Sequence, residues 1–355
     1  MRFVKINLSL NLRTKAHHTL PVKLTNSNRS IKRAGLLCWL TLAASLACAE
    51  NWPCWRGPRG DGTSLEKDPP TQWSGTENIV WKTVVPGEGH SSPIIWDNRI
   101  FLTSALKETQ ERVLLSFDRK TGAVLWQQAV VRTPLEAKNN ENSYASATPA
   151  TDGEKVYLTF LDRDEVVVAA CDFNGKQLWL VRPGRFKSQW GFSHTPVLFE
   201  DKVVVVCYSK GGNFVVAVNR ADGHTVWKTA GENPTQSYSP PLIRKMAGRI
   251  QMITPGNKAV TSYDPQTGKV LWMVDGLADD SVITPVYHEK ADLVLSCTSW
   301  PSKVLVAIKP DGPGKRHVQQ GGLEDLRRRA VCSFPPRGGR LVLHLVLWRQ
   351  GCALL

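Results

Sequence analysis

The stretch Asp118-Arg-Lys-Thr-Gly122-Ala-Val-Leu-Trp126 decides the fold, because it returns along the chain. It recurs almost unchanged at residues 264–272, keeps its spacing at residues 219–227 and is one residue shorter at residues 172–179. Together with an isolated tryptophan upstream, the five tryptophans lie 45, 53, 48 and 45 residues apart: Trp81, Trp126, Trp179, Trp227 and Trp272. A period in this range is typical of propellers and solenoids.

A second marker, a Ser or Thr followed by Pro, runs in phase with the tryptophans. It occurs at Ser92-Pro93, Thr148-Pro149, Thr195-Pro196, Ser239-Pro240 and Thr284-Pro285. Between the markers, short runs of β-branched residues alternate with turns rich in Gly, Asp and Asn, which is the pattern of antiparallel hairpins. No stretch has the 3.6-residue period of an amphipathic helix. The sequence therefore predicts an all-β fold, a β-propeller of four-stranded antiparallel blades with about five blades encoded.

The repeated tryptophans and glycines have a structural role in this interpretation. The Asp or Asn that opens each turn can accept backbone N–H groups, and the glycine supplies a positive φ. Each indole ring is expected to be buried between neighbouring sheets, with its N–H bonded to a carbonyl. We therefore expect the five tryptophans to join blades, together with the turn glycines Gly122, Gly175, Gly223 and Gly268.

The net charge of +14 is concentrated at the two ends of the chain. Residues 1–49 contain eight basic and no acidic residues, and residues 316–355 contain seven basic and two acidic ones. The segment between them carries a net charge of only +1. Because a nearly neutral body does not attract polyanions, we expect no nucleic-acid partner.

The basic N-terminal end has the features of an export signal. Two basic residues precede an apolar run at residues 34–46, and the small residues Ala-Cys-Ala follow at residues 47–49. This pattern is typical of a secretory signal, and the run is shorter than the ~20 residues that span a bilayer. We expect cleavage after Ala49 and an exported protein, periplasmic or extracellular, with no transmembrane span. A buried core helix is one alternative, and a lipoprotein anchored through Cys48 is another, although Ser45 and Leu46 fit a lipobox poorly.

The C-terminal end departs from the repeat. Residues 309–312 are a remnant of the turn motif, but no tryptophan follows near residue 317, and an Arg-rich stretch comes instead. A natural basic tail would explain this change, as would a frameshift or truncation of a longer propeller, which we favour. We expect three parts: a signal peptide with an over-long N-terminal extension at residues 1–49, an incomplete propeller at residues 50–315, and an aberrant basic tail at residues 316–355, non-native or disordered. An unclosed propeller exposes a sheet face, which predicts poor solubility or a partner.

The repeated motif resembles the tryptophan-docking motif of the pyrroloquinoline-quinone (PQQ) repeat family. The opening Asn51-Trp-Pro-Cys-Trp-Arg-Gly-Pro58 is similar to that of secreted bacterial PQQ-like repeat proteins, and the resemblance covers roughly residues 51–312. It implies a propeller related either to the quinoprotein alcohol dehydrogenases or to non-catalytic members, which include the lipoprotein subunit of the outer-membrane barrel-assembly machine.

A quinoprotein dehydrogenase would imply PQQ with a Ca²⁺ or lanthanide ion, a general-base carboxylate and often two adjacent cysteines. None of the eight cysteines is adjacent to another, and no Cys-x-x-Cys or metal spacing occurs. We therefore predict no catalytic residue, no metal site and no cofactor, and PQQ with Ca²⁺ remains what the family implies. A secreted binding or scaffold module is the first hypothesis. A degenerate quinoprotein dehydrogenase and a barrel-assembly-type lipoprotein are the alternatives.

The loops before the Ser/Thr-Pro markers are the candidate binding surface, because they recur at one end of every blade. They carry aromatic, amide and carboxylate groups that suit a protein, a carbohydrate or another polar small molecule. Two histidines among them lack a third ligand for a metal, and ordinary hydrogen-bonded loop residues are the alternative interpretation. The candidate ligand-binding residues are Glu88, His90, Asn142, Tyr144, Trp190, His194, Gln236, Tyr238, Asp279 and Asp280.

Overall fold

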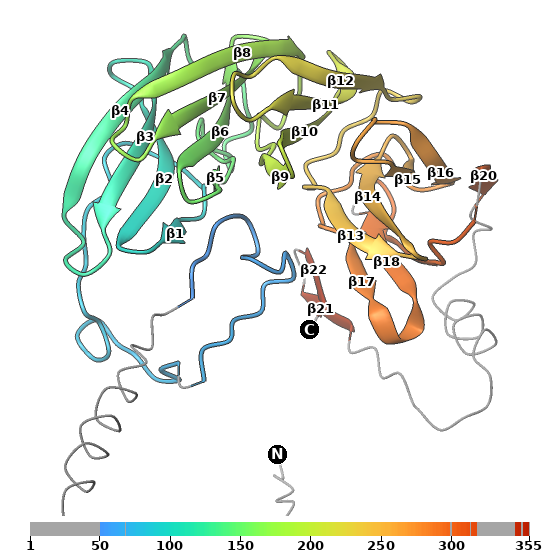
Figure 1. Ribbon diagram of the computed structural model, residues 1–355, viewed down its shortest axis with the longest axis horizontal. Coiled ribbons are helices and arrows are strands. Elements are labelled where there is room, and N and C mark those ends of the chain that lie inside the picture. Colours follow the sequence, from blue (N-terminus) through green and yellow to red (C-terminus); the bar gives the residue numbers. More distant parts are fainter. Residues whose placement is uncertain are drawn as a thin grey trace, which may run out of the picture. The chain divides into compact units, whose positions relative to one another are not determined.

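The computed structural model describes residues 50–67, 69–298, 300–312 and 314–317, and the backbone of residues 345–348 and 351–354 (Figure 1). The expectations for residues 1–49, and for most of residues 316–355, therefore concern residues outside the described ranges. Within these ranges the helical content is a short 3-10 turn, Glu289–Ala291, and no helix is long and apolar enough to cross a bilayer.

The strands form sheets that follow one another in chain order, which we number as blades 1 to 5 (Figure 1). Blade 1 contains β1 (Ile94–Trp96), β2 (Arg99–Leu106), β3 (Glu111–Asp118) and β4 (Val124–Arg132). Blade 2 contains β5 (Ala150–Thr151), β6 (Lys155–Asp162), β7 (Glu165–Asp172) and β8 (Gln177–Arg185). Blade 3 contains β9 (Val197–Phe199), β10 (Lys202–Tyr208), β11 (Asn213–Asn219) and β12 (Thr225–Ala230).

Blade 4 contains β13 (Leu242–Met246), β14 (Arg249–Gly256), β15 (Ala259–Tyr263) and β16 (Val270–Asp275). Blade 5 contains β17 (Val286–His288), β18 (Leu293–Thr298) and β19 (Val304–Ile308). A separate antiparallel hairpin joins β21 (Leu345–Trp348) to β22 (Gly351–Leu354). The prediction of an all-β fold built from propeller-type blades is confirmed.

Each complete blade places its tryptophan at the same point of the outer strand pair. The residue opposite the indole is small in all four blades, and it lies two positions before the turn motif: Ser116, Ala170, Ala217 and Ser262. A register shift follows this residue in every case. Because a bulge increases the local twist of the strand, it turns the tryptophan toward the neighbouring blade.

The tryptophans join each blade to the next. A Cβ atom on the turn glycine of the following blade would lie 2.4 to 3.1 Å from the indole in four cases: Trp81 with Gly122, Trp126 with Gly175, Trp179 with Gly223 and Trp227 with Gly268. Only glycine leaves room for this contact, and its positive φ suits the turn. Each indole N–H also donates to a backbone carbonyl in that turn at 2.9 to 3.1 Å: Arg119, Phe173, Arg220 and Pro265.

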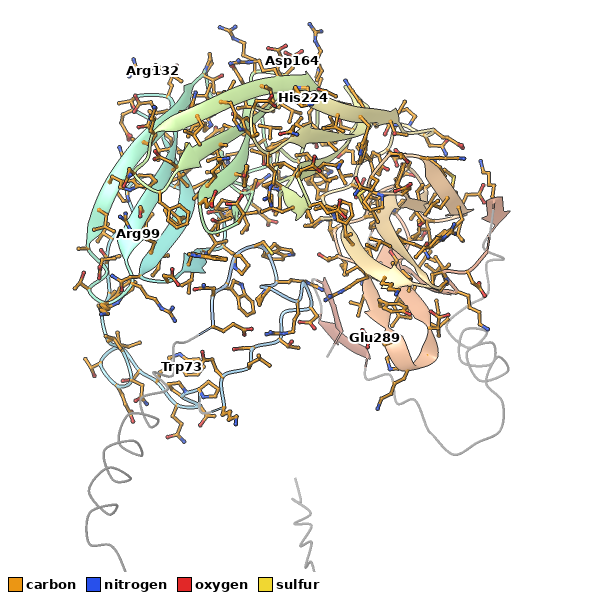
Figure 2. All side chains as sticks on the ribbon, viewed as in Figure 1. Trp73, Arg99, Arg132, Asp164, His224 and Glu289 are labelled. Atoms are coloured by element: carbon orange, nitrogen blue, oxygen red, sulfur yellow. The ribbon has the colours of Figure 1, made fainter. Side chains whose placement is uncertain are left out.

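The hydrophobic core is a series of shared layers between neighbouring blades. One cluster joins blades 1 and 2, the next joins blades 2 and 3, and two more continue through blades 3, 4 and 5. Side chains fill the space between successive sheets (Figure 2). Since each sheet is covered by its neighbours, the stability of a blade depends on the blades beside it.

Blade 5 departs from this pattern. It has three strands, and β20 (Gly314–His317), which comes next, pairs in parallel with β16 at the outer edge of blade 4. The Lys315 ammonium lies 3.0 Å from the Glu232 carboxylate and 3.6 Å from that of Asp275. Within the described residues, the edge of β19 away from β18 therefore has no strand partner.

Gln251 replaces the direct tryptophan contact at the junction of blades 4 and 5. The Trp272 N–H donates to Gln251 Oε1 at 2.7 Å, and the Gln251 amide donates to the Pro310 carbonyl at 3.0 Å. Pro310 holds the position in its turn that supplies the accepting carbonyl in the other blades. The buried Gln251 side chain thus stands between the Trp272 indole and the turn carbonyl, which are in direct contact in the other blades.

The segment just after residue 50 crosses the inner strands. Trp52 exchanges two backbone hydrogen bonds with Ile95 of β1, and the Pro53 carbonyl accepts from the Thr151 N–H of β5 at 2.8 Å. Further on, the Trp55 N–H donates to Thr284 Oγ1 at 3.3 Å, immediately before blade 5. This segment therefore connects the inner sides of blades 1 and 2 with the start of blade 5.

Candidate functional site

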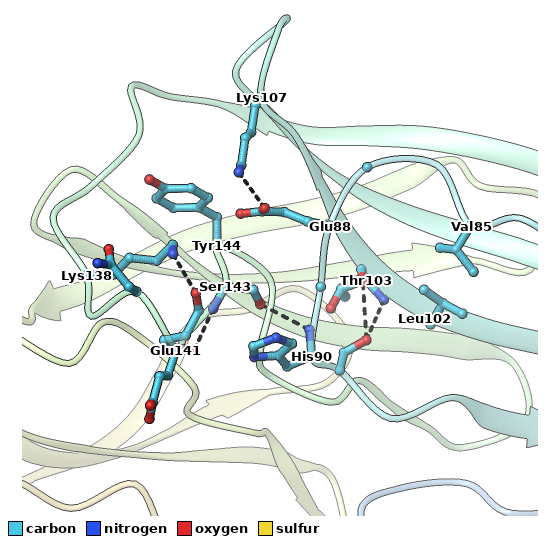
Figure 3. Close-up of a pocket in the computed structure, with 15 residues that line it drawn as sticks. Val85, Glu88, His90, Leu102, Thr103, Lys107, Lys138, Glu141, Ser143 and Tyr144 are labelled. Atoms are coloured by element: carbon cyan, nitrogen blue, oxygen red, sulfur yellow. Dashed lines mark hydrogen bonds and ion pairs between the residues drawn. The ribbon is translucent and has the colours of Figure 1, made fainter.

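A cavity of about 820 Å³ lies between blades 1 and 2 (Figure 3). In an antiparallel blade, the loop before the first strand and the hairpin between the second and third strands lie at the same end. Four of the predicted ligand-binding residues line this cavity: Glu88, His90, Asn142 and Tyr144.

The backbone fixes the two loops against each other. Glu88 forms two backbone hydrogen bonds with Ala105 of β2, at 2.8 and 3.0 Å. The His90 N–H donates to the Ala145 carbonyl and to Ser143 Oγ, both at 3.0 Å. On the other side, the Asn142 amide donates to the Trp190 carbonyl at 2.6 Å and so extends the contact to the connection that follows blade 2. Main-chain and side-chain hydrogen bonds therefore hold the cavity wall, and they come from blade 1 and from the connections that follow blades 1 and 2.

Opposite charges are paired at the cavity wall. The Lys107 ammonium lies 2.5 Å from the Glu88 carboxylate, and this contact raises the pKa of Lys107. Glu88 Oε1 is buried and has no hydrogen-bond partner among the described residues. Lys138 donates to the carbonyls of Asn139 and Asn142, which orders the opposite loop. The wall thus offers both an ammonium group and acceptor oxygens to a ligand.

Tyr144 is surrounded by cations. The centroid of its ring lies 4.7 Å from Lys138 Nζ, 5.1 Å from Arg112 Cζ and 6.0 Å from Lys107 Nζ, within the range of cation–π attraction. Arg112 is fully buried and pairs with Glu136, while its Nε and Nη1 atoms have no partner among the described residues. Burial raises the pKa of Glu136, because desolvation outweighs the nearby guanidinium. These charges hold the ring in place at the cavity wall.

Three of the candidates near blades 3 and 4, His194, Gln236 and Tyr238, contact one another through hydrogen bonds and ring stacking. Tyr238 donates to Gln236 Oε1 at 2.6 Å, and both contact Ser188. His194 is buried against Phe186 and Phe192, and its ring stacks on Tyr238 with the centroids 5.9 Å apart. Burial lowers the pKa of His194 to about 3, so the ring is neutral at ordinary pH. His194 is thus part of the core rather than of the cavity wall.

The last two candidates lie between blades 4 and 5. Asp279 pairs with Lys258 at 3.0 Å, and burial followed by the charge of Asp279 raises the pKa of Asp280. Within the described residues, neither they nor Trp190, His194, Gln236 and Tyr238 line the 820 Å³ cavity. The structure therefore brings four of the ten candidates together and leaves six outside.

Two lysines of the cavity were not identified from the sequence. Lys107 lies in the hairpin after β2, and Lys138 lies in the long connection from blade 1 to blade 2. Neither position is in phase with the tryptophan repeat. The antiparallel order of the strands was the available signal, since it places the hairpin beside the loop before β1.

A quinone cofactor with a hard cation would need several oxygen ligands that converge on the cation. Within the part of the chain that the structure describes, no three His, Cys, Asp or Glu side chains converge to hold a metal ion. The carboxylates of Glu88 and Asp279 are each paired with a lysine. The described cysteines Cys54, Cys171, Cys207 and Cys297 form no disulfide and lie in different parts of the fold.

Comparison with known proteins identifies relatives in one family. The family described as "Outer membrane protein assembly factor BamB" matches residues 71–162 and 110–306. A polyvinylalcohol dehydrogenase of Pseudomonas sp. is 25% identical over 245 residues, which cover 64% of this chain and 35% of the relative. A polyvinylalcohol dehydrogenase of Sphingopyxis sp. (strain 113P3) is 23% identical over 283 residues, 67% of this chain and 41% of the relative.

The chain thus spans well under half the length of these two relatives. Among solved structures, BamB from Moraxella catarrhalis aligns with a TM-score of 0.44 at 16% identity, covering 68% of this chain and 70% of that one.

Proposed function

Because the chain belongs to the PQQ-like repeat family described as outer membrane protein assembly factor BamB, we propose that its blades form a non-catalytic scaffold that binds a polar ligand. The observation that carries this proposal is the cavity between blades 1 and 2, with its pairing of Lys107 and Glu88 beside an aromatic ring. Neither a metal cluster nor a paired-cysteine site accompanies it within the described residues.

The chemistry of the wall suits a polyhydroxylated molecule. The exposed Glu141 carboxylate offers acceptor oxygens, while Lys107 supplies donor N–H groups. Hydroxyl groups can both donate and accept, so they can bond to such a mixed set without bringing a charge that one member would repel. An oligosaccharide or a short polyol is therefore the ligand class that we propose.

Isothermal titration with a maltooligosaccharide, a chitin oligosaccharide and a short polyvinyl alcohol tests this proposal. We expect saturable binding of at least one of them, and weaker binding by the Lys107→Met and Glu141→Gln variants. Lys176→Met is the matched control, because Lys176 is exposed in a turn between the third and fourth strands, at the opposite end of blade 2. No binding to any of the three, or an equal loss in the control, would contradict it.

A PQQ-dependent dehydrogenase is the second candidate, favoured by the names of the two curated relatives. Incubating the purified protein with PQQ and Ca²⁺ and following dye-linked oxidation of polyvinyl alcohol separates the two functions. A bound quinone absorbance with turnover would replace the binding proposal. Ligand binding without turnover supports the scaffold.

We further propose that residues 1–49 are an export signal and that residues 50–315 form the incomplete propeller. Residues 316–355 would then be an aberrant basic tail. The protein would then act in the periplasm or outside the cell. Mass spectrometry of the mature N-terminus tests this: a free Glu50 supports a secreted protein. An acylated Cys48 would favour the alternative, a lipoprotein of the barrel-assembly type with a protein partner, and an intact Met1 would contradict export.

A further inference from the structure

The segment Ile79–Val84 has the sequence of an outer strand but no sheet to complete. Its Val80-Trp-Lys-Thr83 is identical to Val226-Trp-Lys-Thr229 of β12, which pairs with β11 in blade 3. In residues 79–85, by contrast, the described structure contains no strand and no backbone hydrogen bond. Trp81 still contacts Gly122 of blade 1, as the other tryptophans contact the blade after their own.

This segment also exposes apolar side chains that an adjoining strand would cover. Val80 is 89% exposed and Val84 is 88% exposed, whereas Val226, the equivalent of Val80 in β12, is 39% exposed. A run of exposed apolar residues with free backbone groups is a typical template for strand pairing.

Within the described residues, blade 5 lacks an outer strand of the kind that residues 79–84 resemble. It has three inner strands, and the outer edge of β19 is unpaired within the described residues. Ala307 of β19 lies two positions before the turn remnant at residues 309–312, as Ser116, Ala170, Ala217 and Ser262 do before theirs. Those four small residues are buried opposite a tryptophan, but Ala307 is exposed.

We propose that the outer edge of β19 binds residues 79–84 of a second copy of this chain, in antiparallel register with Trp81 opposite Ala307. The pairing extends the interface already formed by Trp81 on blade 1, because the strand that contacts blade 1 of one copy completes blade 5 of the next. The same chain does not make this pairing in the structure, where no hydrophobic cluster joins blade 5 to blade 1 within the described residues. Such a contact is head-to-tail, so it produces chains of copies unless the rotation closes a ring.

Light scattering over a range of protein concentrations provides the first test. We expect the average mass of the purified protein to rise with concentration. Ala307→Ser, which keeps a small residue as in blades 1 and 4, retains the association. Ala307→Arg places a long cation opposite the indole and abolishes the mass increase. A monomer at every concentration, or association that survives Ala307→Arg in a folded variant, overturns the proposal.

Cross-linking distinguishes a second copy from the same chain. In the proposed register Thr83 faces Leu305, so a mixture of Thr83→Cys and Leu305→Cys proteins forms a disulfide-linked species of twice the monomer mass. Thr229→Cys mixed with Leu305→Cys is the matched control, since Thr229 is already paired with Val215 in β11. In the double variant Thr83→Cys/Leu305→Cys, a bond formed only within one chain would contradict pairing between copies. The readout uses no ligand, so it is independent of the function proposed above.

Discussion

Gly223 and Gly248 share a backbone conformation but differ in what surrounds them. Their φ angles are +78° and +79°, yet a Cβ on Gly223 would lie 2.7 Å from the Trp179 ring, while one on Gly248 would meet nothing within 4 Å. Gly248→Ala should cost about 1–2 kcal/mol of unfolding free energy from the left-handed backbone alone. Gly223→Ala should cost a further ~1–3 kcal/mol, because the indole must move. Urea unfolding of both variants measures the difference, and equal losses would mean that the tryptophan contact contributes nothing.

The buried His194 makes stability depend on pH. Burial lowers its pKa to about 3 in the folded protein, against an ordinary value of 6.5, so between these values the unfolded chain binds a proton that the folded chain does not. The unfolding free energy should therefore fall as pH falls below 6.5, by up to ~1.4 kcal/mol per pH unit. Chemical denaturation at pH 7, 6 and 5 measures this slope, which His194→Phe should reduce. The control His224→Gln, at an exposed position (Figure 2), should keep the full slope.

Among elements, the junction of blades 4 and 5 depends on one amide. Gln251→Glu keeps the acceptor for the Trp272 N–H but loses the N–H groups that bond to Met246 and Pro310. A buried carbonyl without its donor costs about 1–3 kcal/mol, so blade 5 should detach at lower denaturant than blades 1–4. Limited proteolysis of wild type and variant, with cleavage sites mapped around residues 286–308, measures this. Unchanged cleavage would show that Gln251 does not couple the blades.

The repeated elements could be predicted from the sequence because each blade uses the same turn and the same tryptophan contact. The glycine must admit an indole and the residue opposite the tryptophan must be small, so both constraints leave periodic marks. The parallel pairing of β20 with β16 could not be predicted. An outer strand edge can pair with any extended segment, so such a pairing leaves no periodic pattern in the sequence. At the candidate site the repeat indicated Glu88 and Tyr144 but not Lys107, which lies in a hairpin out of phase with the tryptophans.

At the scale of the whole molecule, stability should decrease from the middle blade to the last. Cys207 in β10 and Cys297 in β18 are both buried, and neither forms a disulfide. Blade 3 shares hydrophobic clusters with a blade on each side, whereas the cluster that blade 5 shares within the described residues is with blade 4. Because end repeats open first in a nearest-neighbour array, Cys297 should be alkylated at lower urea concentration than Cys207. Pulsed iodoacetamide labelling with peptide mapping measures the order, and simultaneous labelling would indicate a single cooperative unit.

The hydrogen bond between Trp55 and Thr284 joins residues 229 positions apart. During translation the segment around Trp55 leaves the ribosome long before its acceptor is made, by about 10–45 s at usual elongation rates of ~5–20 residues per second. Throughout that interval the nascent chain carries the Trp55 indole without its acceptor, whereas Ile95, the backbone partner of Trp52, is made much earlier. The Trp55 side chain is therefore among the first of the described chain to emerge and among the last to be secured, and a chaperone that shields short aromatic segments would act on it at this stage.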